Sequence, residues 1–156
     1  MTNSFFSPEE NAGSFIAAGC KKAGLSIRNM ILLGMLGGAF IAFAAEGSNV
    51  AVHSIASIGI AKALAGALFF TGLMLVIIAG GELFTGNMMI IISCYEHETR
   101  WRHLLKNWFF VYLGNFMGAF LIVCFILQSG QLNFSDGLLG GFTIKTAVYK
   151  TSLGFR

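Results

Sequence analysis

One short segment of the chain places an acid, a hydroxyl and an amide inside an otherwise apolar region. The segment is Gly81-Glu82-Leu83-Phe84-Thr85-Gly86-Asn87. Turn and cap residues in such surroundings predict an interrupted helix. Backbone that is released from helical pairing is tolerated in a membrane only where it is buried in protein or lines a polar cavity. Broken helices of this kind form many transport sites.

Glu82 is the acid that lies well inside the apolar register, and it has two interpretations. As a functional group it would be a ligand for a proton or an ion. The alternative is a carboxylate that accepts from free N–H groups at the start of the short half-helix, or that pairs with a neighbour. We favour this alternative because the adjacent break supplies donors. The same structural alternative applies to Thr85 and Asn87, which would cap that half-helix.

A second group of candidate ligands lies in a charged loop and consists of Cys94, His97 and His103, with Glu96 and Glu98 nearby. A zinc site needs three or four convergent ligands, and this spacing matches no known ligand pattern. We therefore expect no metal and no cofactor. The sequence also contains no serine elbow, P-loop or HExxH motif, so an enzyme is not expected.

The composition identifies the class of protein that must position these residues. Of 156 residues, 56% are hydrophobic and 11% are charged, and the mean hydropathy is +0.76. Soluble domains carry about 25% charged residues, so an all-α integral membrane protein is predicted. The net charge of +3 is too weak and too dispersed for nucleic-acid binding.

The elements follow from caps and apolar runs. Ser7, Pro8 and Glu10 predict a capping box that begins an amphipathic helix over 7–24, lying along the membrane surface. Because a spanning helix needs about 20 residues, the apolar runs predict three spans. These are span 1 over 29–46, a broken span 2 over 62–95 and span 3 over 104–129. Beyond them we expect an outer loop over 130–156, where Gly137, Gly140 and Gly141 break any long helix.

Two further patterns concern packing and orientation. Small residues recur at helical spacing at Gly34, Gly38 and Ala42 in span 1 and at Gly114 and Gly118 in span 3, which predicts close helix packing without chemistry.

Lys and Arg are more frequent in the N-terminal segment and in the loop after span 2 than in the remaining connections. This bias favours a cytoplasmic N-terminus in the inner (plasma) membrane.

With these residues in view, the chain resembles the formate/nitrite transporter family, which includes hydrosulfide channels. The motif at 81–87 resembles the family's signature loop, and residues 106–108, 112–115 and 149–155 resemble its third helix and the approach to its fourth. The resemblance implies an aquaporin-like helical bundle with a broken second transmembrane helix, in homo-pentamers with one pore per subunit. It also implies six spans, so the C-terminal half, with its pore histidine, is absent, and we expect a fragment of a longer gene product or a truncated protein.

Carried over to matching positions, the resemblance implies a channel or transporter for small monovalent anions, such as formate, nitrite or hydrosulfide, that acts with protons. It assigns the apolar constrictions to Phe69, Leu73, Leu83 and Phe84. It also assigns Thr85 as the loop hydroxyl that bonds toward the absent histidine, and Lys150 as the cation of an anion-attracting vestibule. The alternative for Lys150 is an ordinary surface lysine.

Other functions remain as alternatives. A non-conducting, truncated half would act only as a structural or assembly piece that packs through its glycine faces. A membrane metalloenzyme would use Cys94, His97 and His103. A true aquaporin is disfavoured because the only proline, Pro8, is not preceded by asparagine.

Overall fold

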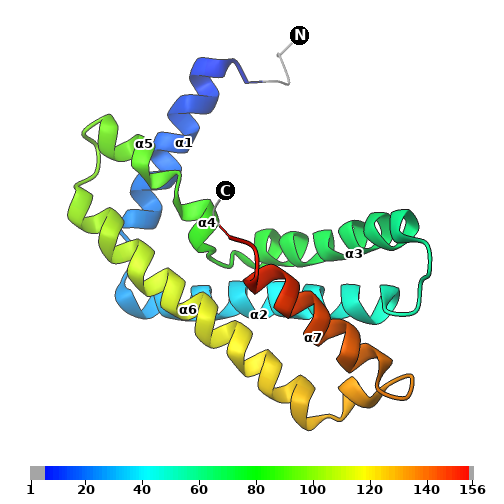
Figure 1. Ribbon diagram of the computed structural model, residues 1–156. Helices are drawn as coiled ribbons and strands as arrows, with labels where there is room; N and C mark the ends of the chain where they lie inside the picture. The colour runs from blue at the N-terminus through cyan, green and yellow to red at the C-terminus, as the bar shows by residue number, and fades with distance from the viewer. Residues whose placement is uncertain (1–5, 155–156) are drawn as a thin grey trace. The chain divides into compact units, whose positions relative to one another are not determined.

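The computed structural model describes residues 6–154, and within that range the chain forms helices and no strand (Figure 1). The helices are α1 (Pro8–Ala23), α2 (Ile27–Val52), α3 (Ile58–Ala79), α4 (Phe84–Asn87), α5 (Ile90–Tyr95), α6 (Trp101–Gln128) and α7 (Leu138–Thr151). A 3₁₀ turn, η1 (Gln131–Asn133), precedes α7. The predicted all-α architecture is confirmed.

Among the described residues, three helices are long and apolar enough to cross a membrane: α2, α3 and α6. They contain 26, 22 and 28 residues, against the roughly 20 that a span needs. The chain between α3 and α6 holds only the short helices α4 and α5, of 4 and 6 residues. The protein is therefore an integral membrane protein whose second apolar segment is interrupted, as the sequence predicts.

The chain divides into two compact units, each built from two separate stretches of sequence. The first unit contains the chain up to Gly38 together with Gly80–Gly118. The second unit contains Ala39–Ala79 and the chain from Ala119 onward. Helices α2 and α6 each contribute their first part to the first unit and their remainder to the second.

In the first unit, α1 begins with the predicted capping box, which is confirmed. The Ser7 hydroxyl accepts from the Glu10 N–H at 3.2 Å, and the Glu10 carboxylate accepts from the Ser7 N–H at 2.7 Å. Helix α1 packs against α5, where Gly19 leaves room for Ser93, whose hydroxyl donates to the carbonyl oxygen of Ile16 at 2.8 Å. The cap and the contact fix both ends of α1.

Helices α2 and α6 pack closely within the first unit through facing glycines. A Cβ added to Gly34 would lie 3.0 Å from the carbonyl oxygen of Val111 and 3.2 Å from the Cα of Gly114. A Cβ on Gly38 would overlap the carbonyl oxygen of Asn115, and one on Gly118 would overlap that of Met35. The predicted packing role of these glycines is confirmed.

The second unit differs from the sequence expectation in one element. Where a loop is expected over 130–156, the 14-residue helix α7 occurs. Packing accommodates Gly140, which lies close to the carbonyl oxygen of Leu132 in η1, and the neighbouring Leu139 is completely buried. Helix α2 also continues six residues beyond the predicted span end at 46, to Val52, where the sequence becomes polar.

Candidate functional site

The interruption after α3 begins at a glycine in a left-handed conformation. Gly80 has φ +68°, which side chains rarely permit, and it ends α3 directly after Ala79. Leu83 is extended, with φ −119° and ψ 134°, and α4 starts at the next residue, Phe84. The chain therefore leaves helical geometry for the four residues 80–83, so their backbone groups need partners outside the helix.

Asn115 of α6 supplies partners on both sides of Leu83. Its Nδ2 donates to the carbonyl oxygens of Glu82 at 2.7 Å and Gly34 at 2.8 Å, and its Oδ1 accepts from the Phe84 N–H at 2.9 Å. The N–H of Glu82 donates to the carbonyl oxygen of Leu33 in α2 at 3.0 Å. One amide side chain thus joins α2, α6 and the interruption. Asn115 also accepts from the first N–H of α4, that of Phe84. Thr85 and Asn87 were the residues expected to cap this helix.

The carboxylate of Glu82 forms an ion pair with Lys22 of α1. The Lys22 Nζ lies 2.9 Å from Oε1 and 2.8 Å from Oε2, and the Glu82 side chain is 10% exposed. Of the interpretations of Glu82, the geometry supports pairing with a neighbour. The sequence analysis missed Lys22 as this neighbour, because the two residues lie 60 positions apart.

Asn87 and Asn107 extend this ion pair into a buried polar network. Lys22 Nζ also donates to Asn87 Oδ1 at 3.1 Å, and Asn87 Nδ2 donates to Asn107 Oδ1 at 2.8 Å. Asn107 Nδ2 returns a hydrogen bond to the carbonyl oxygen of Lys22 at 2.9 Å. Both asparagines are completely buried. The network closes a ring from the end of α1 through α4 to α6.

The other predicted residues of the interruption lie at its surface or against aromatic rings. The ring of Phe84 packs edge-on against Trp108 and Tyr112, with centroids 5.7 and 5.6 Å apart. Leu83 is half-buried, whereas Thr85 and Gly86 are exposed. Within the described part of the chain, the Thr85 hydroxyl makes no hydrogen bond.

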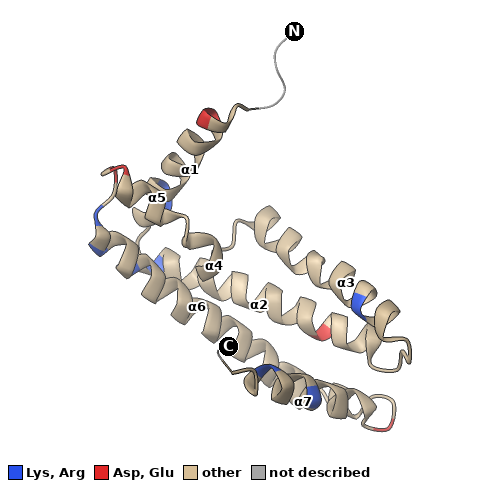
Figure 2. Ribbon diagram, turned by 45° about the horizontal axis from the view of Figure 1, so that its top comes forward, with Lys and Arg blue, Asp and Glu red and all other residues tan. Residues whose placement is uncertain are grey.

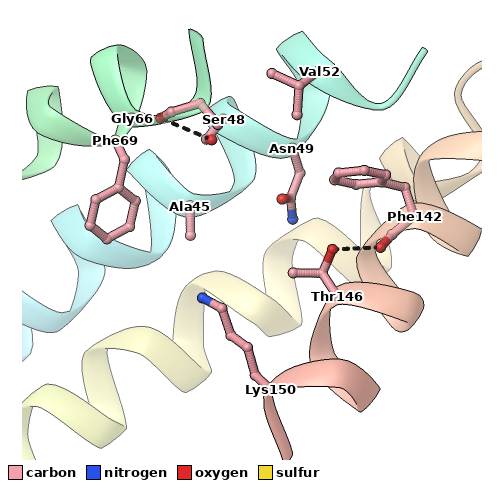
Figure 3. A pocket seen from close by; sticks show the side chains of 10 residues that line it. Ala45, Ser48, Asn49, Val52, Gly66, Phe69, Phe142, Thr146 and Lys150 are labelled. Atoms are coloured by element: carbon pink, nitrogen blue, oxygen red, sulfur yellow. Dashed lines mark hydrogen bonds between the residues drawn. The ribbon is translucent and has the colours of Figure 1, made fainter. Parts of the chain in front are cut away.

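A pocket of about 370 Å³ lies in the second unit, between α2, α3 and α7 (Figure 3). Its polar lining comes from Ser48, Asn49, Thr146 and Lys150, and its apolar lining includes Phe69. Figure 3 shows the Lys150 side chain extending from α7 with its ammonium group toward the wall that contains Ala45. Among residues 6–154, the Lys150 ammonium group has no hydrogen bond or ion pair. The pocket therefore holds one unpaired cation beside apolar and hydroxyl-bearing walls.

The structure distributes the predicted pore residues over both units. Phe69 and Lys150 line the same pocket in the second unit. Leu73 lies one turn beyond Phe69 on α3 and is equally exposed, at 38%, but it does not line that pocket. Leu83, Phe84 and Thr85 belong to the first unit.

The sequence analysis also missed Glu46, a buried acid in α2. Its side chain lies in the second unit, the residue is 8% exposed, and its Oε1 has no hydrogen-bond partner in the described part of the chain. A helical pattern that continues past residue 46 was the sequence signal that could have placed Glu46 inside α2. Cys94 is buried in α5 while His97 and His103 are exposed, and no group of three metal-binding side chains occurs within residues 6–154.

Comparison with known proteins gives consistent matches along the chain. A family model described as formate/nitrite transporter matches residues 9–156. The chain is 36% identical over 154 residues to the formate channel BtFdhC of Bacillus thuringiensis, covering 94% of this chain and 54% of that protein. It is 33% identical over 150 residues to a probable formate transporter of Methanothermobacter thermautotrophicus, covering 92% and 55%.

A shorter match joins it to the formate channel FocA of Escherichia coli strain K12, with 32% identity over 92 residues, covering 59% of this chain and 32% of FocA. The chain thus spans about half the length, or less, of these curated relatives.

Proposed function

The chain belongs to the formate/nitrite transporter family, and we propose that it forms part of a channel or transporter for small monovalent anions. Formate, nitrite and hydrosulfide are the substrate class, and protons accompany them. The proposal is supported by the relatives named formate channels and by the membrane-spanning character of α2, α3 and α6. Since the chain spans about half of these relatives, the proposed activity is that of the assembled protein.

Lys150 and its pocket are the observation that carries this proposal. An unpaired ammonium group beside a pocket raises the local concentration of small anions. The side-chain amide of Asn49 adds two N–H groups to the lining, one of which donates to Thr143. The hydroxyls of Ser48 and Thr146 donate to backbone carbonyl oxygens and face the pocket with acceptor oxygens. The volume of about 370 Å³ admits a small hydrated anion before it loses its water. The pocket therefore acts as the vestibule.

The apolar residues explain why protons take part. An ionised anion that enters an apolar constriction loses hydration at a large free-energy cost, whereas its neutral acid does not. We assign the constrictions to Phe69, Leu73, Leu83 and Phe84, with Thr85 as the hydroxyl of the interruption. Because the Lys150 charge favours the ionised form, protonation occurs deeper than the vestibule.

The interruption provides the frame for this route. Gly81, Glu82, Gly86 and Asn87 form the loop and short helix, and the ion pair from Glu82 to Lys22 keeps the loop tied to α1. We further propose that the assembled protein is a homo-pentamer with a cytoplasmic N-terminus in the inner membrane. The family and the distribution of Lys and Arg support this arrangement.

Lys150→Ala tests the proposal directly, and Lys145→Ala on the same helix is the matched control because Lys145 is exposed and does not line the pocket. The protein is reconstituted into liposomes, and formate influx is followed by stopped-flow light scattering. We expect the Lys150 variant to lose about 5- to 30-fold in flux at low anion concentration, the equivalent of roughly 1–2 kcal/mol of charge interaction. Equal fluxes for both variants would show that Lys150 is an ordinary surface lysine.

The alternative function is a non-conducting half that serves as a structural or assembly piece. The observation in its favour is the coverage of only about half of the relatives' length. Reconstituted protein of normal helicity that carries no formate at any pH would support this alternative. Formate influx that rises as the pH falls supports the proton-assisted channel.

A further inference from the structure

Four cationic or ring-nitrogen side chains converge on a second pocket, at the start of α6 in the first unit. Arg100, Arg102, His103 and Lys106 line this pocket, which has a volume of about 460 Å³. Figure 2 shows the basic positions gathered at this end of α6, whereas the rest of the helix carries no charged residue. We call these four residues the basic pocket.

No acidic side chain among residues 6–154 neutralises the basic pocket. The nearby acids Glu96 and Glu98 are exposed, and neither forms an ion pair with a basic side chain in the part that the structure describes. Within residues 6–154, the one hydrogen bond of Lys106 Nζ is a weak one, at 3.4 Å, to the carbonyl oxygen of Leu25. Arg100, Arg102 and Lys106 therefore present net positive charge that an external anion can bind.

The surroundings indicate where this anion lies relative to the membrane. Tyr95 and Trp101 pack edge-on with ring centroids 5.6 Å apart, and they are 70% and 50% exposed. Exposed Tyr and Trp at the end of a spanning helix are typical of the membrane–water interface. The basic pocket thus lies at the level of the lipid headgroups.

An apolar stripe continues from the basic pocket along α6. Leu105 and Phe109 follow Arg102 at helical spacing, so the three share one face of the helix. Leu105 and Phe109 are 60% and 64% exposed, and Tyr112, one turn farther, is 61% exposed. A ligand with an anionic head and long acyl chains matches both features, whereas a free anion matches only the first.

We infer that the basic pocket is a binding site for the phosphate headgroup of an anionic phospholipid, whose acyl chains lie along the apolar stripe. The arginines bind the phosphate oxygens in bidentate fashion, and Lys106 adds a point charge. Basic pockets beside spanning helices bind such headgroups in other membrane proteins. The site is independent of the anion pathway that we propose above.

The test compares lipid retention by wild-type protein and by the triple variant Arg100→Gln/Arg102→Gln/Lys106→Gln. Dioleoylphosphatidylglycerol is titrated into protein in neutral detergent, and native mass spectrometry counts the bound lipids while a thermal scan follows stability. Each removed charge lowers the apparent affinity about fivefold, so we expect the triple variant to lose about 100-fold. Neutral dioleoylphosphatidylcholine is expected to bind both proteins equally weakly.

Lys62→Gln is the matched control, because Lys62 is exposed on α3 and lies in the other unit. It is expected to retain phosphatidylglycerol as wild type does. The conservative variant Arg100→Lys/Arg102→Lys keeps the charges and is expected to stay within about fivefold of wild type, so misfolding and lost recognition are distinguished. Equal retention by the triple variant and wild type would overturn the inference.

Inorganic phosphate distinguishes a site for a lipid phosphate headgroup from a site for a free phosphate ion. At millimolar concentration it is expected to leave the thermal midpoint of the wild type unchanged. If phosphate alone stabilised the protein as much as phosphatidylglycerol does, and the triple variant abolished that effect, the site would bind free anions and the lipid assignment would be wrong.

Discussion

The two units of the chain use the same scarce polar residues in opposite ways. In the first unit, Lys22, Glu82, Asn87, Asn107 and Asn115 bond to one another or to the interrupted backbone. In the described part of the second unit, Lys150 has no ion pair and Glu46 Oε1 has no hydrogen-bond partner. The difference teaches that the unit with the interrupted helix uses its charged side chains for structure, whereas the second unit, within residues 6–154, leaves a lysine and a carboxylate oxygen without partners.

The physical reason lies in the membrane environment. An unsatisfied backbone group in an apolar setting costs several kcal/mol, so residues 80–83 require partners such as Asn115. Helices α3 and α7 satisfy their own backbone over most of their length. Lys150 in the second unit is therefore available to face a pocket.

The largest loss of folding stability that would test this comparison is expected at Gly38. In Gly38→Ala, the added Cβ overlaps the carbonyl oxygen of Asn115, and backbone cannot rotate away as a side chain can. We expect a destabilisation of more than about 3 kcal/mol, above the usual range for overpacking, and little folded protein. The midpoint of SDS-induced unfolding in mixed micelles measures it.

Gly47→Ala on the same helix is the control, because a Cβ there meets nothing within 4 Å. It is expected to be neutral or slightly stabilising, since alanine favours helix. If both variants unfolded at the same SDS fraction, the close packing of α2 on α6 would not be a structural requirement.

The next effect concerns the buried ion pair. Lys22→Met leaves the Glu82 carboxylate 10% exposed and without its cation. Breaking a buried pair from one side costs about 3–5 kcal/mol, and we expect the lower end because the Lys22 side chain is 33% exposed. The same unfolding assay measures the loss.

The double variant Lys22→Met/Glu82→Gln sharpens this test, because it removes the buried charge as well as its partner. We expect it to recover more than half of the lost stability. A double variant as unstable as Lys22→Met would mean that Lys22 acts through Asn87 or through packing, and not through the carboxylate.

The smallest effect is expected in the second unit, at Ser48. Its hydroxyl donates to the carbonyl oxygen of Ala65 at 3.2 Å, joining α2 to α3. Such interhelical bonds in membranes average about 0.6 kcal/mol, so Ser48→Ala should shift unfolding only slightly. Ser152→Ala, whose hydroxyl bonds within its own helix, is expected to cause no measurable shift. A loss of more than about 2 kcal/mol at Ser48, beyond the largest such bonds measured, would erase the contrast between the units.

Features that depend on neighbouring residues were predictable from the sequence. Ser7 and Glu10 lie three positions apart, and their capping box is confirmed. The three long apolar runs and the interruption near Gly81 also follow from local pattern, because apolar periodicity and turn residues act over a few positions. The family motif at 81–87 is equally local, and membership in the family is confirmed.

Features that depend on distant contacts were not predictable. Lys22 pairs with Glu82, which lies 60 positions away, so no local pattern indicates the ion pair. Asn115 satisfies groups of α2 and of the interruption, which no periodicity reports. Helix α7 forms despite its glycines because Leu139 is buried and Gly140 packs against η1, so tertiary contact overrides propensity there.

The position of Asn115 also sets an order of events during synthesis. Glu82 leaves the ribosome after its partner Lys22, but 33 residues before Asn115. At a synthesis rate of about 5–20 residues per second, the interruption waits roughly 2–7 s for its main hydrogen-bonding partner. During that interval the N–H of Phe84 lacks the acceptor that it has in the folded chain, so we expect the second apolar segment to enter the hydrocarbon region fully only after α6 has been made.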